Sequence, residues 1–303
     1  MALNQGPAGN FSAREQAWRA WCEPDPVRKA SAARAMASAL AAGQAGIDPQ
    51  WLASGDAAAL LGAQPPQSPG RPARPVLVAP DAVAKRPGNS PAGRVALMHA
   101  IAHIEFNAID LALDAVWRFD AMPPQFYADW IRVADEEAQH FQLVCEWLAG
   151  QGAAYGDCNA HDGLWQMAAR TRHDLIARMA LVPAVLEARG LDATPMIQQR
   201  LQRTAADLRN AKDALAVADI DVALTVLDRI LQDEIGHVRI GRYWYEWLCA
   251  RAGLEPDATF ESLMQNFNAP WPKPPVNLAA RRAAGFFEAM LGRFSQPRTR
   301  KTP

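Results

Sequence analysis

Hydrophobic residues make up 50% of the 303-residue chain, and its 31 basic and 32 acidic residues give a formal net charge of −1 at pH 7. This apolar content excludes a chain that is disordered throughout, and it allows a sizeable core. The balanced charge removes the electrostatic argument for a protein that binds nucleic acid over its whole surface.

The cysteines and the first residues bear on where the protein works. Cys22, Cys145, Cys158 and Cys249 form no CxxC pair, which disfavours a disulfide scaffold or a cysteine zinc site and fits a reducing compartment. The opening MALNQGPAGN lacks the basic and apolar regions of a secretory signal. Because the sequence has no run of 18 or more apolar residues, we expect a cytoplasmic protein that does not span a membrane.

Residues 1–91 are predicted to form an N-terminal extension. Alanine-rich stretches without glycine favour helices over 12–22 and 25–42, and Asp25-Pro26 has the pattern of an N-cap followed by proline at the first helical position. The proline-rich segment 66–91 disfavours both helix and sheet. It is predicted to be an extended strap that docks through the apolar residues 76–78; a disordered linker is the alternative.

The sequence pattern of residues 92–253 is typical of a helical bundle. Apolar residues recur every three or four positions, and no β alternation is visible. Breakers are predicted at 122–124, 152–163, 190–195 and 219–221. The resulting helices cover 93–118, 124–150, 163–189, 195–213 and 220–252. The remaining segment, 254–303, is predicted to be a proline-rich extension with a solvated basic tail. The fold class is therefore all-α, with three parts.

Two predicted helices contain the spacing Glu-x-x-His. These are Glu137 with His140 and Glu234 with His237. Residues three apart lie on one face of a helix, so one metal ion can meet both side chains. Each glutamate also lies among apolar residues of its helix face. Because a charged side chain is rarely buried unless it is paired or bound to metal, this pattern points to a metal site.

A carboxylate site in a four-helix bundle needs one acid from each of the other two helices. The helix 93–118 offers Glu105, and the end of the helix 163–189 offers Glu187; Asp174 and Asp207 are the substitutes if Glu187 points away. Four carboxylates with two imidazoles suit two iron ions, two manganese ions or a mixed iron–manganese pair. A lone catalytic zinc ion usually has three protein ligands, which makes zinc the less suitable metal.

Residues beside these six give weaker patterns. Asp233 could reach His140 and Glu136 could reach His237 as outer partners of the ligands, or both acids could simply be solvated. His99 and His103 lie on the helix face opposite Glu105. They read as structural histidines, with a second site or a proton path as the alternative.

Two further residues are candidates for catalysis. Tyr245 lies eleven positions after Glu234 on the same helix face, where it could relay an electron or pack in the core. His161 precedes the helix that begins at 163 and could gate the site, or could belong to a helix cap formed with Asp162.

The order of ligands resembles that of the ferritin-like di-iron and di-manganese carboxylate proteins, and the chain resembles more closely the bacterial ferritin-like "domain of unknown function 455" family. The segments that carry this likeness are HAIAHIEFNAIDLALDAVWRF, FYADWIRVADEEAQHF, YGDCNAHDGLW, LEARGLDATP and DEIGHVRIG, between residues 99 and 241. The resemblance implies a ferritin-like four-helix bundle. It also implies Glu105, Glu137, His140, Glu187, Glu234 and His237 as metal ligands, and it implies no substrate.

These observations favour an oxidoreductase that uses dioxygen or peroxide to oxidise or hydroxylate an unidentified small molecule, with an unidentified electron donor. Two alternatives stay open: a non-enzymatic protein that handles iron or detoxifies peroxide, and an RNA-associated protein that uses the basic tail. Nucleic acid and membrane partners are disfavoured, and a homodimer is allowed.

Overall fold

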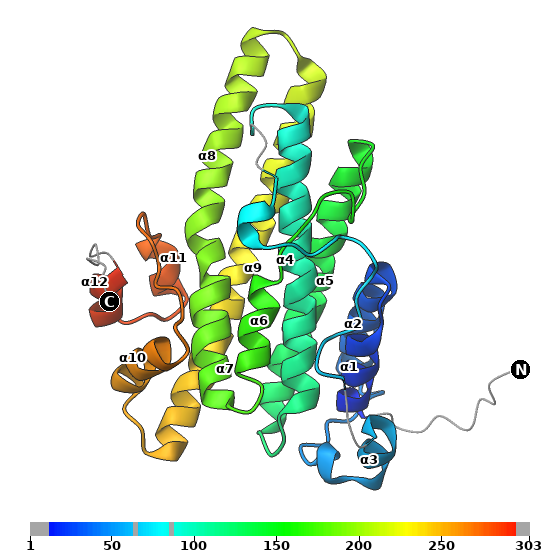
Figure 1. Ribbon diagram of the computed structural model, residues 1–303, viewed down its shortest axis with the longest axis vertical. Helices are drawn as coiled ribbons and strands as arrows, with labels where there is room; N and C mark the ends of the chain where they lie inside the picture. Colours follow the sequence, from blue (N-terminus) through cyan, green and yellow to red (C-terminus); the bar gives the residue numbers. More distant parts are fainter. Residues whose placement is uncertain (1–11, 63–65, 85–87, 295–303) are drawn as a thin grey trace, which may run out of the picture. The chain divides into compact units, whose positions relative to one another are not determined.

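The computed structural model describes residues 12–62, 66–84 and 88–294 (Figure 1). These residues contain helices and two isolated β-bridges but no strand, which confirms the all-α prediction. The chain divides into two compact units. The first comprises Met1–Ala84 and Val95–His161, and the second comprises Lys85–Arg94 and Asp162–Pro303. The three-part division expected from the sequence stays a prediction.

The first unit is built around two long helices. Its elements are α1 (Ala13–Cys22), α2 (Pro26–Ala41), η1 (Trp51–Ala53), α3 (Gly55–Leu61), η2 (Pro80–Ala82), most of α4 (Pro91–Arg118) and α5 (Pro124–Gly150). The two long helices and α1 and α2 match the predicted helices within two residues at each end. The predicted N-cap is confirmed, because the Asp25 carboxylate accepts a hydrogen bond from the amide of Arg28 over 2.9 Å. The sequence did not predict the three shorter elements.

Arg14 of α1 caps the C-terminal end of helix α4. Its fully buried guanidinium donates hydrogen bonds to the carbonyls of Val116, Trp117 and Phe119 over 3.0, 2.9 and 3.0 Å, and it pairs with Asp120. The last carbonyls of a helix have no partner within the helix. One side chain from the extension therefore satisfies the end of α4, which ties α1 to the core of this unit.

The predicted strap over residues 66–84 lies against the same unit, although it does not dock as expected. Val78 donates its amide to the carbonyl of Ala160 over 2.8 Å, and the amide of Ala160 donates to the carbonyl of Val76 over 3.1 Å. The side chains of Val76 and Leu77 stay 52% and 40% exposed. The prediction of apolar docking was therefore wrong for Val76 and Leu77, whereas Val78 is half-buried, and backbone hydrogen bonds join this part of the strap to Ala160.

Helix α4 is long and apolar enough to cross a membrane by length and composition alone. Its most apolar 18-residue window has a mean hydropathy of 1.2, and 72% of that window is buried inside the protein. The same helix carries buried charged residues, among them Glu105, Asp110 and Asp114. These properties are those of a core helix, and no other helix in the described part of the chain passes the same test.

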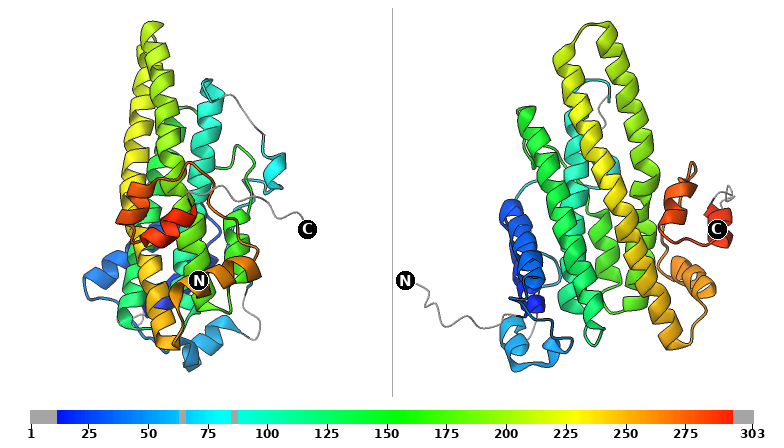
Figure 2. Two further views of the ribbon diagram at one scale, coloured as in Figure 1. Left: turned by 90° about the vertical axis from the view of Figure 1, so that its left-hand side faces the viewer. Right: turned by 180° about the vertical axis from the view of Figure 1, so that it is seen from behind.

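The second unit is built around the hairpin of α8 and α9 (Figure 2). Its elements are α6 (Gly163–Arg170), α7 (Leu175–Leu181), the π-helix η3 (Val182–Glu187), α8 (Ala188–Asn210), α9 (Ala214–Ala252), α10 (Pro256–Asn266), α11 (Leu278–Ala283) and α12 (Glu288–Phe294). The predicted single helix over 163–189 is wrong. The chain breaks after α6, and the carboxylate of Asp174 then caps α7 by accepting the amide of Ala177 over 2.9 Å.

The predicted break at 190–195 is also wrong, because α8 continues through Pro195. A proline inside a helix removes the hydrogen bond to the carbonyl four residues earlier, here that of Leu191. The side-chain amide of Asn277 donates to this carbonyl over 3.1 Å. Asn277 is the N-cap of α11, so a residue distant in the sequence repairs the helix at the proline.

The predicted break at 219–221 is wrong as well, because α9 runs through these residues. Its true start is capped by Asp213, whose carboxylate accepts the amide of Ala216 over 3.1 Å. Ile220, between the two predicted breaking acids, is fully buried. Aspartate lowers helix propensity only slightly, so burial of the isoleucine decides the local structure.

The C-terminal extension is folded as far as residue 294. Arg281 of α11 is buried, and it donates to the carboxylate of Asp192 and to the carbonyl of Ala188 in α8. Arg293 of α12 pairs with Glu261 of α10. The prediction of a solvated tail was therefore wrong for Arg281, whereas Lys273 and Arg282 are exposed and 295–303 lie outside the described residues.

Gly241 of α9 gives a test of the packing in the second unit. A Cβ at this position would lie 2.3 Å from the Cβ and Cγ of Pro183 in η3, whereas a Cβ at Gly236 of the same helix would meet nothing within 4 Å. We expect Gly241→Ala to destabilise the protein by about 1–3 kcal/mol through overpacking. Gly236→Ala should instead leave stability unchanged or raise it by up to about 1 kcal/mol. Urea unfolding of both variants measures this difference, and equal effects would contradict the close packing of α9 on η3.

Candidate metal centre

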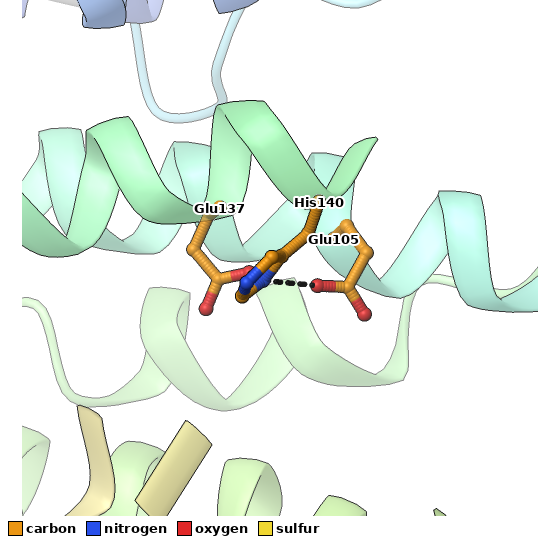
Figure 3. A group of neighbouring side chains, drawn as sticks. All are labelled: Glu105, Glu137 and His140. Atoms are coloured by element: carbon orange, nitrogen blue, oxygen red, sulfur yellow. Dashed lines mark ion pairs between the residues drawn. The ribbon is translucent and has the colours of Figure 1, made fainter. Parts of the chain in front are cut away.

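Helices α4 and α5 bring together three of the six predicted ligands within the first unit (Figure 3). Glu105 comes from α4, and Glu137 and His140 come from α5 one turn apart. Their residues are 5%, 2% and 1% exposed, so the expected burial of all three is confirmed. The surrounding residues of their helix faces are apolar and equally buried; they include Met98, Ala102, Ile109, Val133, Ala134, Phe141 and Val144.

The geometry of this triad suits a shared cation. The Nδ1 atom of His140 lies 3.2 Å from Oε2 of Glu105 and 3.4 Å from Oε2 of Glu137. One ligand atom from each of the three side chains lies within 4.8 Å of the others. Two atoms bound to one ion at about 2.0–2.3 Å are at most about 4.6 Å apart, so small adjustments would allow all three to bind one ion. The donors fit iron or manganese.

The electrostatics of the triad point the same way. Burial raises the pKa of Glu105 to about 8, and the neighbouring carboxylate of Glu137 acts in the same direction. Burial alone lowers the pKa of His140, but the two carboxylates outweigh this effect and raise that pKa to about 11. The carboxylates therefore favour a positive charge between them, which a proton or a metal ion can supply.

The second unit holds two further predicted ligands as a pair. Glu234 and His237 lie one turn apart on α9, where they are 8% and 0% exposed, and His237 Nδ1 lies 3.2 Å from Glu234 Oε2. Gly190 in the first turn of α8 faces this pair, since a Cβ there would lie 3.7 Å from Cγ of Glu234. The first turn of α8 therefore lies beside the carboxylate at a distance that also leaves room for a Cβ.

Glu187 lies one turn before Gly190 and is the last residue of the π-helix η3. Its side chain is half-buried, as the end of a predicted helix allowed. A π-helix is rare and is often found at functional sites. Here the π-helix includes Pro183 and determines the position of Glu187 around the helix axis. The two substitutes for Glu187 have other positions, because Asp174 caps α7 and Asp207 is exposed.

The remaining predicted site residues have clear local surroundings. Asp233 pairs with Arg229 of its own helix, and Glu136 is half-buried on α5; their roles beside His140 and His237 stay predictions. The hydroxyl of Tyr245 donates to the carbonyl of Pro256 over 2.6 Å, which links α9 to α10. The side chain of His161 is exposed.

His99 and His103 behave as structural histidines. His99 Nε2 accepts the amide of Gly156 over 2.8 Å, and His103 Nδ1 lies 2.9 Å from the hydroxyl of Tyr155. The sequence did not single out Tyr155, since a tyrosine in a loop shows no periodicity. Its ring nevertheless packs on Phe141, with ring centres 5.1 Å apart.

Comparison with known proteins gives a family but no activity. A family model described as "Protein of unknown function (DUF455)" matches residues 22–292, which contain all six predicted ligands. A protein of Haemophilus influenzae described as an uncharacterized protein is 47% identical over 227 residues, which cover 73% of this chain and 74% of that protein. No solved structure matches the chain.

Proposed function

This chain belongs to the DUF455 family, and we propose that it is a ferritin-like dinuclear metal protein that uses dioxygen or peroxide to oxidise or hydroxylate a small molecule. The buried triad of Glu105, Glu137 and His140 carries this proposal. An uncompensated buried charge costs several kcal/mol, so two carboxylates in an apolar interior favour a bound cation between them.

Two ions are proposed because the chain holds the ligand pattern twice. The order Glu, Glu-x-x-His, Glu, Glu-x-x-His is that of dinuclear carboxylate sites in four-helix bundles. Glu105, Glu137 and His140 would serve as the first set, and Glu187, Glu234 and His237 as the second. The proposal that both sets hold one pair of ions rests on this order and on the geometry within each set.

The side chains of the triad have distinct parts in this proposal. Bound iron or manganese would supply redox chemistry with dioxygen or peroxide. Glu105 and Glu137 would balance the charge of the ions, and His140 would give up the proton that it holds between the two carboxylates. The apolar residues around the triad exclude water, which strengthens each of these electrostatic interactions.

The metal content of the purified protein tests the proposal. Protein expressed without added metal is expected to carry two iron or manganese ions per chain by elemental analysis. Anaerobic reduction followed by exposure to dioxygen should then change the near-ultraviolet absorbance and consume dioxygen. The proposal would be contradicted if the protein carried no metal under any loading condition, or if it bound only zinc.

Metal content and two further assays separate the alternatives. A storage protein would accumulate many irons per chain, whereas a detoxifying protein would consume peroxide without needing an organic substrate. A protein that works on RNA would be retained on RNA at moderate salt and lose this retention when residues 293–301 are deleted.

A further inference from the structure

A histidine of α4 holds the loop that follows α5. The Nε2 atom of His99 accepts hydrogen bonds from two backbone amides of this loop, that of Gly156 over 2.8 Å and that of Cys158 over 3.4 Å. A ring nitrogen can accept these bonds only while it carries no proton. The contact therefore requires His99 to be neutral.

The held loop covers the helix pair that bears the triad. Tyr155 stacks on the ring of His99 at 5.4 Å and packs on Phe106 and Phe141, with ring centres 5.5 and 5.1 Å away. Phe106 follows Glu105 in the chain, and Phe141 follows His140. Release of the loop would thus uncover the two aromatic residues next to the triad.

The surroundings of His99 favour its neutral form. His99 is 1% exposed, and this burial lowers the pKa of its side chain from the ordinary value of 6.5. Asp157 of the loop opposes this effect weakly. The other polar groups nearby are His103 on the next turn of α4, the Tyr155 hydroxyl, and Arg74 of the strap, whose Cβ and backbone lie beside Gly156.

We propose that residues 154–158 form a flap over α4 and α5 that acid releases through protonation of His99, while Ala160 stays paired with the strap. The closed flap excludes the proton, whereas an open flap leaves His99 free to bind one. Closure is therefore most stable above the ordinary pKa of histidine and weakens as the pH falls below it. This inference does not depend on metal binding, since it concerns two backbone amides.

Hydrogen exchange of the full chain tests the proposal. Protection factors correct for the intrinsic effect of pH on exchange. Those of the Gly156 and Cys158 amides are expected to be about tenfold lower at about pH 5.5 than at about pH 7.5, because the open form has an ordinary histidine pKa near 6.5. Amides in the middle of α5 and α9 should keep their protection, which separates local opening from unfolding.

Two variants assign the effect. In His99→Gln the side-chain carbonyl can accept the same amides but does not titrate, so protection should be the same at both pH values. His173→Gln changes an exposed histidine of the second unit and should behave like the unchanged protein. The proposal fails if wild-type protection does not respond to pH, or if His99→Gln retains the tenfold loss.

Discussion

Glu137→Ala is expected to abolish stoichiometric metal binding. Loss of an outer partner of a metal ligand already costs about 10–100-fold in affinity, and loss of a direct ligand should cost at least as much. The Oε2 atom of Glu137 lies 3.4 Å from Nδ1 of His140, and the residue is 2% exposed, so the substitution removes a ligand from the buried centre of the triad. Elemental analysis and metal titration of the purified variant measure the effect.

The variant should still fold. Without metal, the wild-type protein holds the carboxylates of Glu105 and Glu137 close together in an apolar interior, and removing one of them relieves that repulsion. Metal should therefore raise the melting temperature of the wild-type protein but not that of the variant. Glu146→Ala removes an exposed acid from the same helix and should keep full metal content. Two metals bound per chain in folded Glu137→Ala would show that the ligand set is wrong.

The sequence predicted the triad because its pattern is local. Glu-x-x-His places two ligands on one helix face whatever surrounds the helix, and the apolar neighbours of Glu105 indicated that this glutamate is buried. The N-cap at Asp25 was predictable for the same reason, since the cap and its partner Arg28 are three residues apart.

Features that depend on distant partners could not be predicted. Proline at 195 indicates a helix end, and nothing nearby reveals that Asn277 bonds the carbonyl left by the proline. The strap was assigned to apolar docking because residues 76–78 are hydrophobic, whereas Val76 and Val78 make backbone bonds to Ala160, and Lys29 binds the carbonyl of Gly70. Arg14 and Lys29 are fully buried, and nothing in the alanine-rich sequence around them indicates the distant carbonyls and carboxylates that they contact.

Lys29→Met is expected to destabilise the protein by about 3–5 kcal/mol, because it leaves a buried carboxylate without its cation. Lys29 of α2 pairs with Asp110 of α4, and both side chains are fully buried. The ammonium group also donates to the carbonyl of Gly70 over 2.8 Å and to that of Trp21 over 3.2 Å. The substitution therefore removes the donors that hold α2 and the start of the strap to α4.

The loss of stability in Lys29→Met should depend on pH, and the titration of the buried Asp110 determines the direction. Burial raises the pKa of Asp110 to about 6 even though Lys29 lowers it, so the pKa in the variant should be higher still. A group whose pKa is raised in the folded state stabilises the folded protein at low pH, and this contribution is lost as the pH rises. The deficit of Lys29→Met should therefore be smaller at about pH 5 than at about pH 7.5 in urea unfolding.

Two comparisons decide whether the buried pair is responsible. Arg34→Met on the same helix removes a partly exposed charge near Asp135 and should cost at most about 1 kcal/mol. The double variant Lys29→Met with Asp110→Leu removes both charges and should recover most of the lost stability, since apolar replacements of a buried pair are often neutral. If Lys29→Met costs no more than Arg34→Met, the pair does not hold the N-terminal extension to α4. If the double variant recovers nothing, the carbonyl contacts of the ammonium group, and not the ion pair, provide the stability.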